Sequence, residues 1–132
     1  MNDRGTVLPA LALLLIGGLM MIGVGIDLGR LGATYREVAY VADAGADAGA
    51  AMINHQDARV GVLALDPSAA ELTAVDTALA VRSRDGRIVV ATSTREEVCV
   101  EVQQVFRPGI MRAVGATESL VTVRSCAQPA QG

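Results

Sequence analysis

Apolar residues are distributed unevenly along the chain, and the first feature is a long uncharged run near the N-terminus. Residues 6–26 form a stretch of 21 residues without a charge, of which 15 are hydrophobic. A helix of this length spans about 31 Å, close to the roughly 30 Å hydrocarbon thickness of a bilayer. The pattern predicts a transmembrane helix over residues 6–26, preceded by a short cytoplasmic leader of residues 1–5.

Two other interpretations of this run stay open. A secretory signal carries an apolar stretch of about 7–15 residues before its cleavage site, and cleavage near Ala33 would free a secreted protein. A buried core helix is usually shorter, and a domain made from the remaining 106 residues could not surround the whole run. We favour the retained membrane helix, because the run is too long for a signal and passes directly into helix-compatible sequence.

The helical pattern continues past the apolar run. Between Asp27 and Ile53 there is no proline, and large or small apolar residues recur at alternating steps of three and four, which is a period of about 3.5 residues. The series comprises Leu28, Leu31, Tyr35, Val38, Ala42, Gly45, Gly49 and Met52. We therefore predict one helix from about residue 6 to residue 53, with residues 27–55 as an extracytoplasmic continuation of the membrane span.

Small residues recur along this helix and predict close packing. Gly25 and Gly29 are four residues apart, a spacing that lets another backbone approach. In the distal half, over residues 42–52, we expect the small residues to pack against the chain's own globular part. Nearer the membrane we expect contact with helices of other subunits, through an interface of Gly25, Leu28, Gly29, Leu31, Ala33, Tyr35 and Val38.

The second half of the chain predicts a helix. Asp66 and Pro67 form a helix-start signal, and Ser68 and Glu71 have the spacing of a capping box. An apolar stripe follows at steps of three and four, formed by Leu72, Val75 and Leu79. We expect this helix to end between residues 82 and 86.

Strand patterns follow the second helix. β-branched residues at 88–90 predict one strand, and clean alternation at 98–103 and 120–126 predicts two more, joined by a short helix or packed loop. The predicted fold class is α+β, with a long N-terminal helix, a second helix and a small antiparallel sheet of about three strands. Residues 56–127 form its small extracytoplasmic domain, and residues 128–132 a disordered tail.

Cys99 and Cys126 are the two cysteines of the chain. A pair of thiols favours a disulfide outside the cytoplasm over a metal site, which would want four ligands. In an antiparallel pair with these cysteines opposite one another, Glu101 faces Arg124 as a cross-strand ion pair. The same register places Gln103 opposite Thr122 and Val102 opposite Val123. One register thus satisfies a disulfide, a charge pair and an apolar face.

Composition argues against several classes of function. The basic residues are eleven arginines with a formal net charge of −3, and no basic cluster is denser than Arg82, Arg84 and Arg87, which argues against nucleic acid. One Phe, two Tyr and no Trp argue against an aromatic-lined pocket for a small-molecule substrate. His55 has no neighbouring ligand and is expected to be exposed at a helix end. We expect no catalytic residue, no metal, no cofactor and no enzymatic activity.

Residues 4–51 resemble the N-terminal region of TadE/TadG-like proteins, which are pilin-like components of the bacterial tight-adherence (Flp) pilus assembly system. The resemblance rests on Arg4, Gly5 and Thr6, the apolar run, residues 26–31 and the Ala/Asp/Gly-rich residues 41–51, and it is looser over residues 96–127. It implies a single-pass pseudopilin or minor pilin of the inner (cytoplasmic) membrane, in or beside a surface filament. The implied partners are the lipid bilayer, other pilin-like subunits and the assembly machinery.

The resemblance also implies a cleavage site for a prepilin peptidase between Gly5 and Thr6. Pilins that polymerise carry Glu at the fifth residue after the cut, where this chain has Ala10. The departure favours a membrane-retained accessory. A second hypothesis has the same topology without a pilus: a bitopic, membrane-anchored extracytoplasmic binding or sensor domain, with its ligand face on the sheet.

Overall fold

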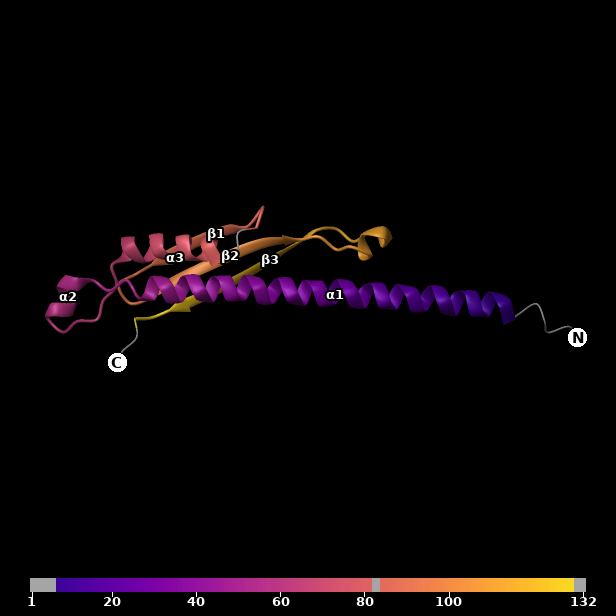
Figure 1. Cartoon of the computed structure of the whole chain (residues 1–132), viewed down its shortest axis with the longest axis horizontal. Helices are drawn as coiled ribbons and strands as arrows, with labels where there is room; N and C mark the ends of the chain where they lie inside the picture. Colours follow the sequence, from indigo (N-terminus) through magenta and orange to yellow (C-terminus); the bar gives the residue numbers. More distant parts are fainter. Residues whose placement is uncertain (1–6, 82–83, 130–132) are drawn as a thin grey trace, which may run out of the picture. The chain divides into compact units, whose positions relative to one another are not determined.

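The computed structural model describes residues 7–81 and 84–129, and these form the predicted α+β fold (Figure 1). The elements in chain order are α1 (Val7–Ala50), α2 (His55–Arg59), α3 (Pro67–Val81), β1 (Ile88–Ser93), β2 (Val98–Phe106), the 3-10 helix η2 (Met111–Val114) and β3 (Ser119–Ala127). The long apolar N-terminal helix, the further helix α3 and the three-stranded antiparallel sheet are confirmed. The predicted cleavage site at Gly5 and Thr6 lies outside the described residues.

The chain divides into two compact units, and α1 contributes to both. One unit combines α1 up to Ala33 with Arg107–Glu118, the segment that connects β2 to β3. The other combines the rest of α1 with α2, α3 and the sheet. Each unit therefore joins parts that are distant in the sequence, whereas the division predicted from the sequence follows chain order with a boundary at residue 56.

The sheet has the strand order β1-β2-β3, and both pairs are antiparallel (Figure 1). Cys99 lies opposite Cys126, and Glu101 lies opposite Arg124. The pairs Val102 with Val123 and Gln103 with Thr122 also form, so the predicted register is confirmed. Because side chains alternate along a strand, this register sends Val98, Val100 and Val102 to the buried face.

The core of the unit that contains the sheet depends on small residues. A Cβ atom built on Gly45 would lie 2.9 Å from the carbonyl oxygen of Ala74, and one on Gly49 would lie 2.9 Å from that of Ala70. The backbones of α1 and α3 are therefore in close contact, and the valines of β2 pack beside them. The prediction that the distal half of the long helix packs on the chain's own domain is confirmed.

The buried face of α3 differs from the predicted one. Its buried residues are Ala70, Ala74 and Ala78, while Leu72 is 69% exposed. The predicted stripe is wrong because the close approach at Gly45 and Gly49 has room only for methyl side chains.

The start of α3 also differs in detail from the predicted capping box. Asp66 is the capping residue, since its Oδ1 accepts hydrogen bonds from the backbone N–H and hydroxyl of Ser68 and from the N–H of Ala69. These bonds, that of the Ser68 hydroxyl foremost, lower the pKa of Asp66. Glu71 does not complete a capping box; its carboxylate accepts from the N–H and hydroxyl of Ser93 in β1.

The close contact at Gly45 predicts an unusual result for a glycine in a helix. Replacing it with alanine should lower the free energy of unfolding by about 1–3 kcal/mol through overpacking, although alanine is intrinsically favoured over glycine in a helix by about 1 kcal/mol. Gly29→Ala is the matched control, because nothing lies within 4 Å of a Cβ there and stability should not fall. Denaturant unfolding of the full chain in detergent, followed by circular dichroism, measures both. Equal effects would refute the close packing.

Candidate functional site

The first part of α1 is uncovered in this chain. Its most apolar window has a mean hydropathy of 2.5, and only 6% of that window is buried. Leu8, Leu14 and Met21 are among its exposed large side chains. A helix that is apolar all round and this long is suited to the interior of a membrane. α1 is therefore a candidate single membrane span.

One side of this segment is an open glycine face, which we define as Gly18, Gly25, Gly29 and Gly32. A Cβ atom at any of these positions would meet nothing within 4 Å. The period of 3.6 residues per turn places all four on one side of α1. The predicted interface residues Leu28, Ala33 and Tyr35 are also exposed, and Leu31 is half-buried. Contact of these residues with another subunit stays a prediction.

Val38 does not belong with the exposed residues of the predicted interface. It is 1% exposed and belongs to the core of the chain's own domain. Alternating steps of three and four spread a series over two neighbouring sides of a helix with 3.6 residues per turn. Leu28 and Tyr35 lie on one of these sides, whereas Val38 lies with the half-buried Leu31 toward the side of the buried Asp27. Val38 is consequently unavailable to a partner.

Asp27, directly after the predicted span, is a buried charged residue that the sequence analysis did not identify as a site. Its side chain is 1% exposed. Oδ1 accepts a hydrogen bond from the N–H of Gly109 at 2.9 Å, and Oδ2 accepts from those of Ile110 at 2.8 Å and Met111 at 2.7 Å. Backbone N–H groups at the start of a helical turn have no acceptor within that turn. The carboxylate of Asp27 is the acceptor for these three N–H groups. Asp27 therefore fixes the segment Arg107–Glu118 to α1.

The fit around Asp27 is close. A Cβ atom on Gly109 would lie 2.7 Å from Nη1 of Arg30 and 3.3 Å from Oδ1 of Asp27. Arg30 lies 3.9 Å from the same oxygen and contributes a favourable charge. One turn earlier on α1, a Cβ on Gly23 would lie 2.5 Å from Cγ2 of Ile110. A side chain at position 23 would thus collide with Ile110, whereas one at position 109 would require the flexible, exposed side chain of Arg30 to move.

The hydrogen bonds lower the pKa of Asp27. The N–H of Met111 has the largest effect, desolvation opposes it, and Gly109, Ile110 and the charge of Arg30 lower the pKa further. A depressed carboxyl pKa stabilises the folded form above its ordinary value of 3.8, and this contribution is lost as pH falls through the lowered value. The contact should therefore hold at neutral pH and fail only in strong acid.

Asp27→Asn should release the segment that the carboxylate holds. The amide cannot accept all three hydrogen bonds, so hydrogen-exchange protection factors at Gly109, Ile110 and Met111 should fall by about tenfold or more. Glu118→Gln is the control, because the exposed pair of Arg107 and Glu118 at 2.9 Å should contribute little. Unchanged protection in the Asp27 variant would show that the carboxylate does not hold the segment.

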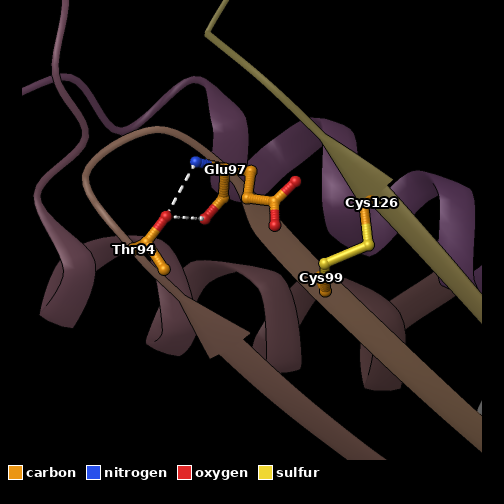
Figure 2. The surroundings of a disulfide bond; sticks show 4 residues. All are labelled: Thr94, Glu97, Cys99 and Cys126. Atoms are coloured by element: carbon orange, nitrogen blue, oxygen red, sulfur yellow. Dashed lines mark hydrogen bonds between the residues drawn. A yellow bond between two sulfur atoms is a disulfide. The ribbon is translucent and has the colours of Figure 1, made fainter.

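The predicted disulfide is present and joins β2 to β3 (Figure 2). Cys99 and Cys126 are 27 residues apart in the sequence. The turn before β2 is closed by Thr94, whose hydroxyl accepts from the N–H of Glu97 and donates to its carbonyl oxygen. The bridge therefore lies next to a hydrogen-bonded turn at one end of the sheet.

The predicted ion pair between Glu101 and Arg124 does not form, although the two residues are opposite one another. The carboxylate of Glu101 instead accepts a hydrogen bond of 2.8 Å from the side-chain amide of Gln103, two residues along the same strand and face. The sequence predicts that Glu101 pairs with its cross-strand neighbour Arg124. In the structure, Gln103 on the same strand and face binds the carboxylate instead.

Two residues of the basic cluster, Arg84 and Arg87, pair within the chain, whereas Arg82 lies outside the described residues. Arg87 and Arg84 both form salt bridges with Glu37 of α1, at 2.9 Å and 3.3 Å. His55 is exposed as the first residue of α2, as predicted. Among the described residues, no three His, Cys, Asp or Glu side chains are grouped so that they could hold a metal ion.

Comparison with known proteins does not supply a function. No family model, no curated protein and no solved structure matches the chain.

Proposed function

We propose that this protein is a non-enzymatic, pilin-like component of a tight-adherence type pilus assembly or secretion system. It acts by packing its membrane helix against the helices of other pilin-like subunits. The observation that carries the proposal is α1, a 44-residue helix with an uncovered apolar first part and a second part buried in its own domain. The resemblance over residues 4–51 implies a pseudopilin or minor pilin. In such a protein, the first part of the long helix would anchor the chain in the membrane and the second part would pack in the core of its own domain.

The open glycine face supports contact with other helices. Each interior glycine costs a helix about 1 kcal/mol relative to alanine, so a face of four glycines weakens α1 unless packing compensates. Within membranes, small residues four apart let two helices approach closely, and Gly25 and Gly29 have this spacing. Asp27, which holds the chain's own segment, lies on the opposite side of α1. The two sides of the helix therefore serve different contacts.

The disulfide supports an inner-membrane location with the N-terminus in the cytoplasm and the domain outside it, since such bonds persist in oxidising compartments. N-terminal sequencing of the mature protein separates the forms that the sequence allows. A start at Thr6 identifies prepilin-peptidase processing, and a start at Met1 or Asn2 a retained anchor. A start beyond Ile26 identifies a secreted protein and contradicts the proposal.

Crosslinking in native membranes tests the packing step. Gly25→Leu combined with Gly29→Leu should reduce crosslinks to other subunits severalfold, because the new side chains keep the helices apart. Gly17→Leu is the matched control, since Gly17 is equally open but lies on a different side of α1. The disulfide should form in all variants. Undiminished crosslinks in the double variant would contradict the close-packing role.

A second candidate function rests on the outer face of the sheet. The strand register places Ile88, Val90 and Leu120 on the same face, and all three are exposed. This uncovered face, on which apolar side chains alternate with polar ones such as Glu101 and Gln103, would suit a membrane-anchored extracytoplasmic binding or sensor domain. Neighbouring genes for a secretion ATPase and a prepilin peptidase would favour the pilus component, whereas a neighbouring kinase or transporter gene would favour the sensor.

A further inference from the structure

The segment Arg107–Glu118, here named the boundary loop, is held beside the end of the predicted membrane span. Three of its backbone N–H groups bind Asp27, the first residue after the apolar run. The side chain of Ile110 extends further, to Gly23, four residues earlier and inside the run. Four residues of helix are about 6 Å along its axis. If residues 7–26 cross a bilayer, Ile110 therefore lies at a depth that the membrane occupies.

The boundary loop exposes apolar side chains at this level. Val114 is 66% exposed and Ile110 is about half exposed. Ala113 is also exposed. Loops are ordinarily polar at their tips, and an apolar tip beside a membrane helix has a natural environment in the boundary between headgroups and acyl chains.

The charges of the boundary loop fit the same environment. Arg107 and Arg112 line one hollow of this loop, together with Pro108, Ala116, Thr117 and Glu118. Glu118 pairs with Arg107 at 2.9 Å, so the charge of Arg112 is left in excess. Arginine beside apolar side chains is suited to the interface, where its stem contacts acyl chains and its guanidinium meets lipid phosphate.

We propose that the boundary loop is a second membrane contact, which inserts Ile110 and Val114 into the interfacial region of the leaflet beside α1 and places Arg112 at the phospholipid phosphates. The proposal rests on the membrane anchoring proposed above. It is supported by two contacts that join the loop to the end of the span. The N–H of Ile110 donates to Asp27, and the side chain of Ile110 lies against Gly23. Together, α1 and the loop give the protein two membrane attachments in place of one.

Fluorescence quenching in nanodiscs tests the second contact. The full chain is placed in nanodiscs of phosphatidylcholine and phosphatidylglycerol at one copy per disc. The Val114→Cys variant carries an environment-sensitive label on the new thiol. The native cysteines do not react with the label because they form a disulfide. Leu14→Cys in the span is the positive control, and Leu72→Cys on α3, which is equally exposed, is the negative control. The quenchers are lipids with a nitroxide near the carbonyl end of the acyl chain, and aqueous iodide.

Nitroxide lipid should quench the label at position 114 by at least half as much as the label at position 14, and the label at 114 should be protected from iodide. The label at position 72 should show the reverse. Quenching at 14 without quenching at 114 would overturn the boundary-loop proposal and leave the anchor intact. Absence of lipid quenching at both would overturn the anchor as well. Protection at 114 that requires two copies per disc would identify a protein contact and also overturn the proposal.

Discussion

Replacing Arg87 with alanine is expected to lower the free energy of unfolding by about 3–5 kcal/mol, because it leaves the carboxylate of Glu37, whose side chain is only 13% exposed, with the solvent-exposed Arg84 as its remaining charged partner. Nη2 of Arg87 lies 2.9 Å from Oε1 of Glu37, and its Nε donates to Oε1 of Gln104 at 3.2 Å. The side chain of Arg87 is only 1% exposed. The loss should be seen in denaturant unfolding of the full chain in detergent, as a lower midpoint with unchanged slope.

Arg84 offers a matched control for this prediction. It pairs with the other oxygen of Glu37 at 3.3 Å, but it is 54% exposed. Arg84→Ala should therefore cost only about 0–1 kcal/mol. Replacing both partners, with Glu37→Leu and Arg87→Met, should recover most of the loss, since the charge that remains, on Arg84, is exposed to solvent. Similar losses in the two single arginine variants would contradict the account of a buried pair.

Removing the disulfide should have the second large effect. The combined change Cys99→Ala and Cys126→Ala opens a loop with a sequence separation of 27 residues, and the chain-entropy relation gives a loss of about 3–4 kcal/mol. The ladder between β2 and β3 still forms, so the expected outcome is a folded but less stable protein. Denaturant unfolding under oxidising conditions measures the difference from the wild type.

A second cross-strand pair provides the control. Gln103 lies opposite Thr122 between the same strands, and replacing both with alanine should cost about 1 kcal/mol or less. An equal loss in both double variants would show that the disulfide adds nothing beyond a side-chain pair. Mass analysis of the wild type without reductant should show the loss of two hydrogens per chain. Free thiols at both positions would contradict the extracytoplasmic placement of the domain.

The strand register could be predicted because it depends on a local pattern with a simple period. Alternation along residues 98–103 and 120–126 fixes which side chains share a face, and Cys99 with Cys126 then selects one register. The long helix could also be predicted from the sequence, since there is no proline between residues 10 and 53. These features depend on residues close to each other in the chain or on one covalent constraint.

The contacts that the sequence did not reveal depend on tertiary distance. Asp27 binds residues more than 80 positions away, and only an acid directly after the apolar run hinted at a role. The sequence pattern does not reveal that the alanines of α3, and not Leu72, form its buried face, because this depends on how closely α1 approaches. The pair of Glu101 and Arg124 failed because Gln103 offered a nearer partner on the same face.

Electron microscopy of cells that lack the gene tests the central claim most directly. If the chain is a pilin-like assembly component, the number of surface fibrils should fall markedly in the deletion strain and recover when the wild-type gene is restored. A complementing gene with Gly25→Leu and Gly29→Leu should fail to restore them despite normal amounts of membrane-bound protein. Normal fibrils in the deletion strain would contradict the claim.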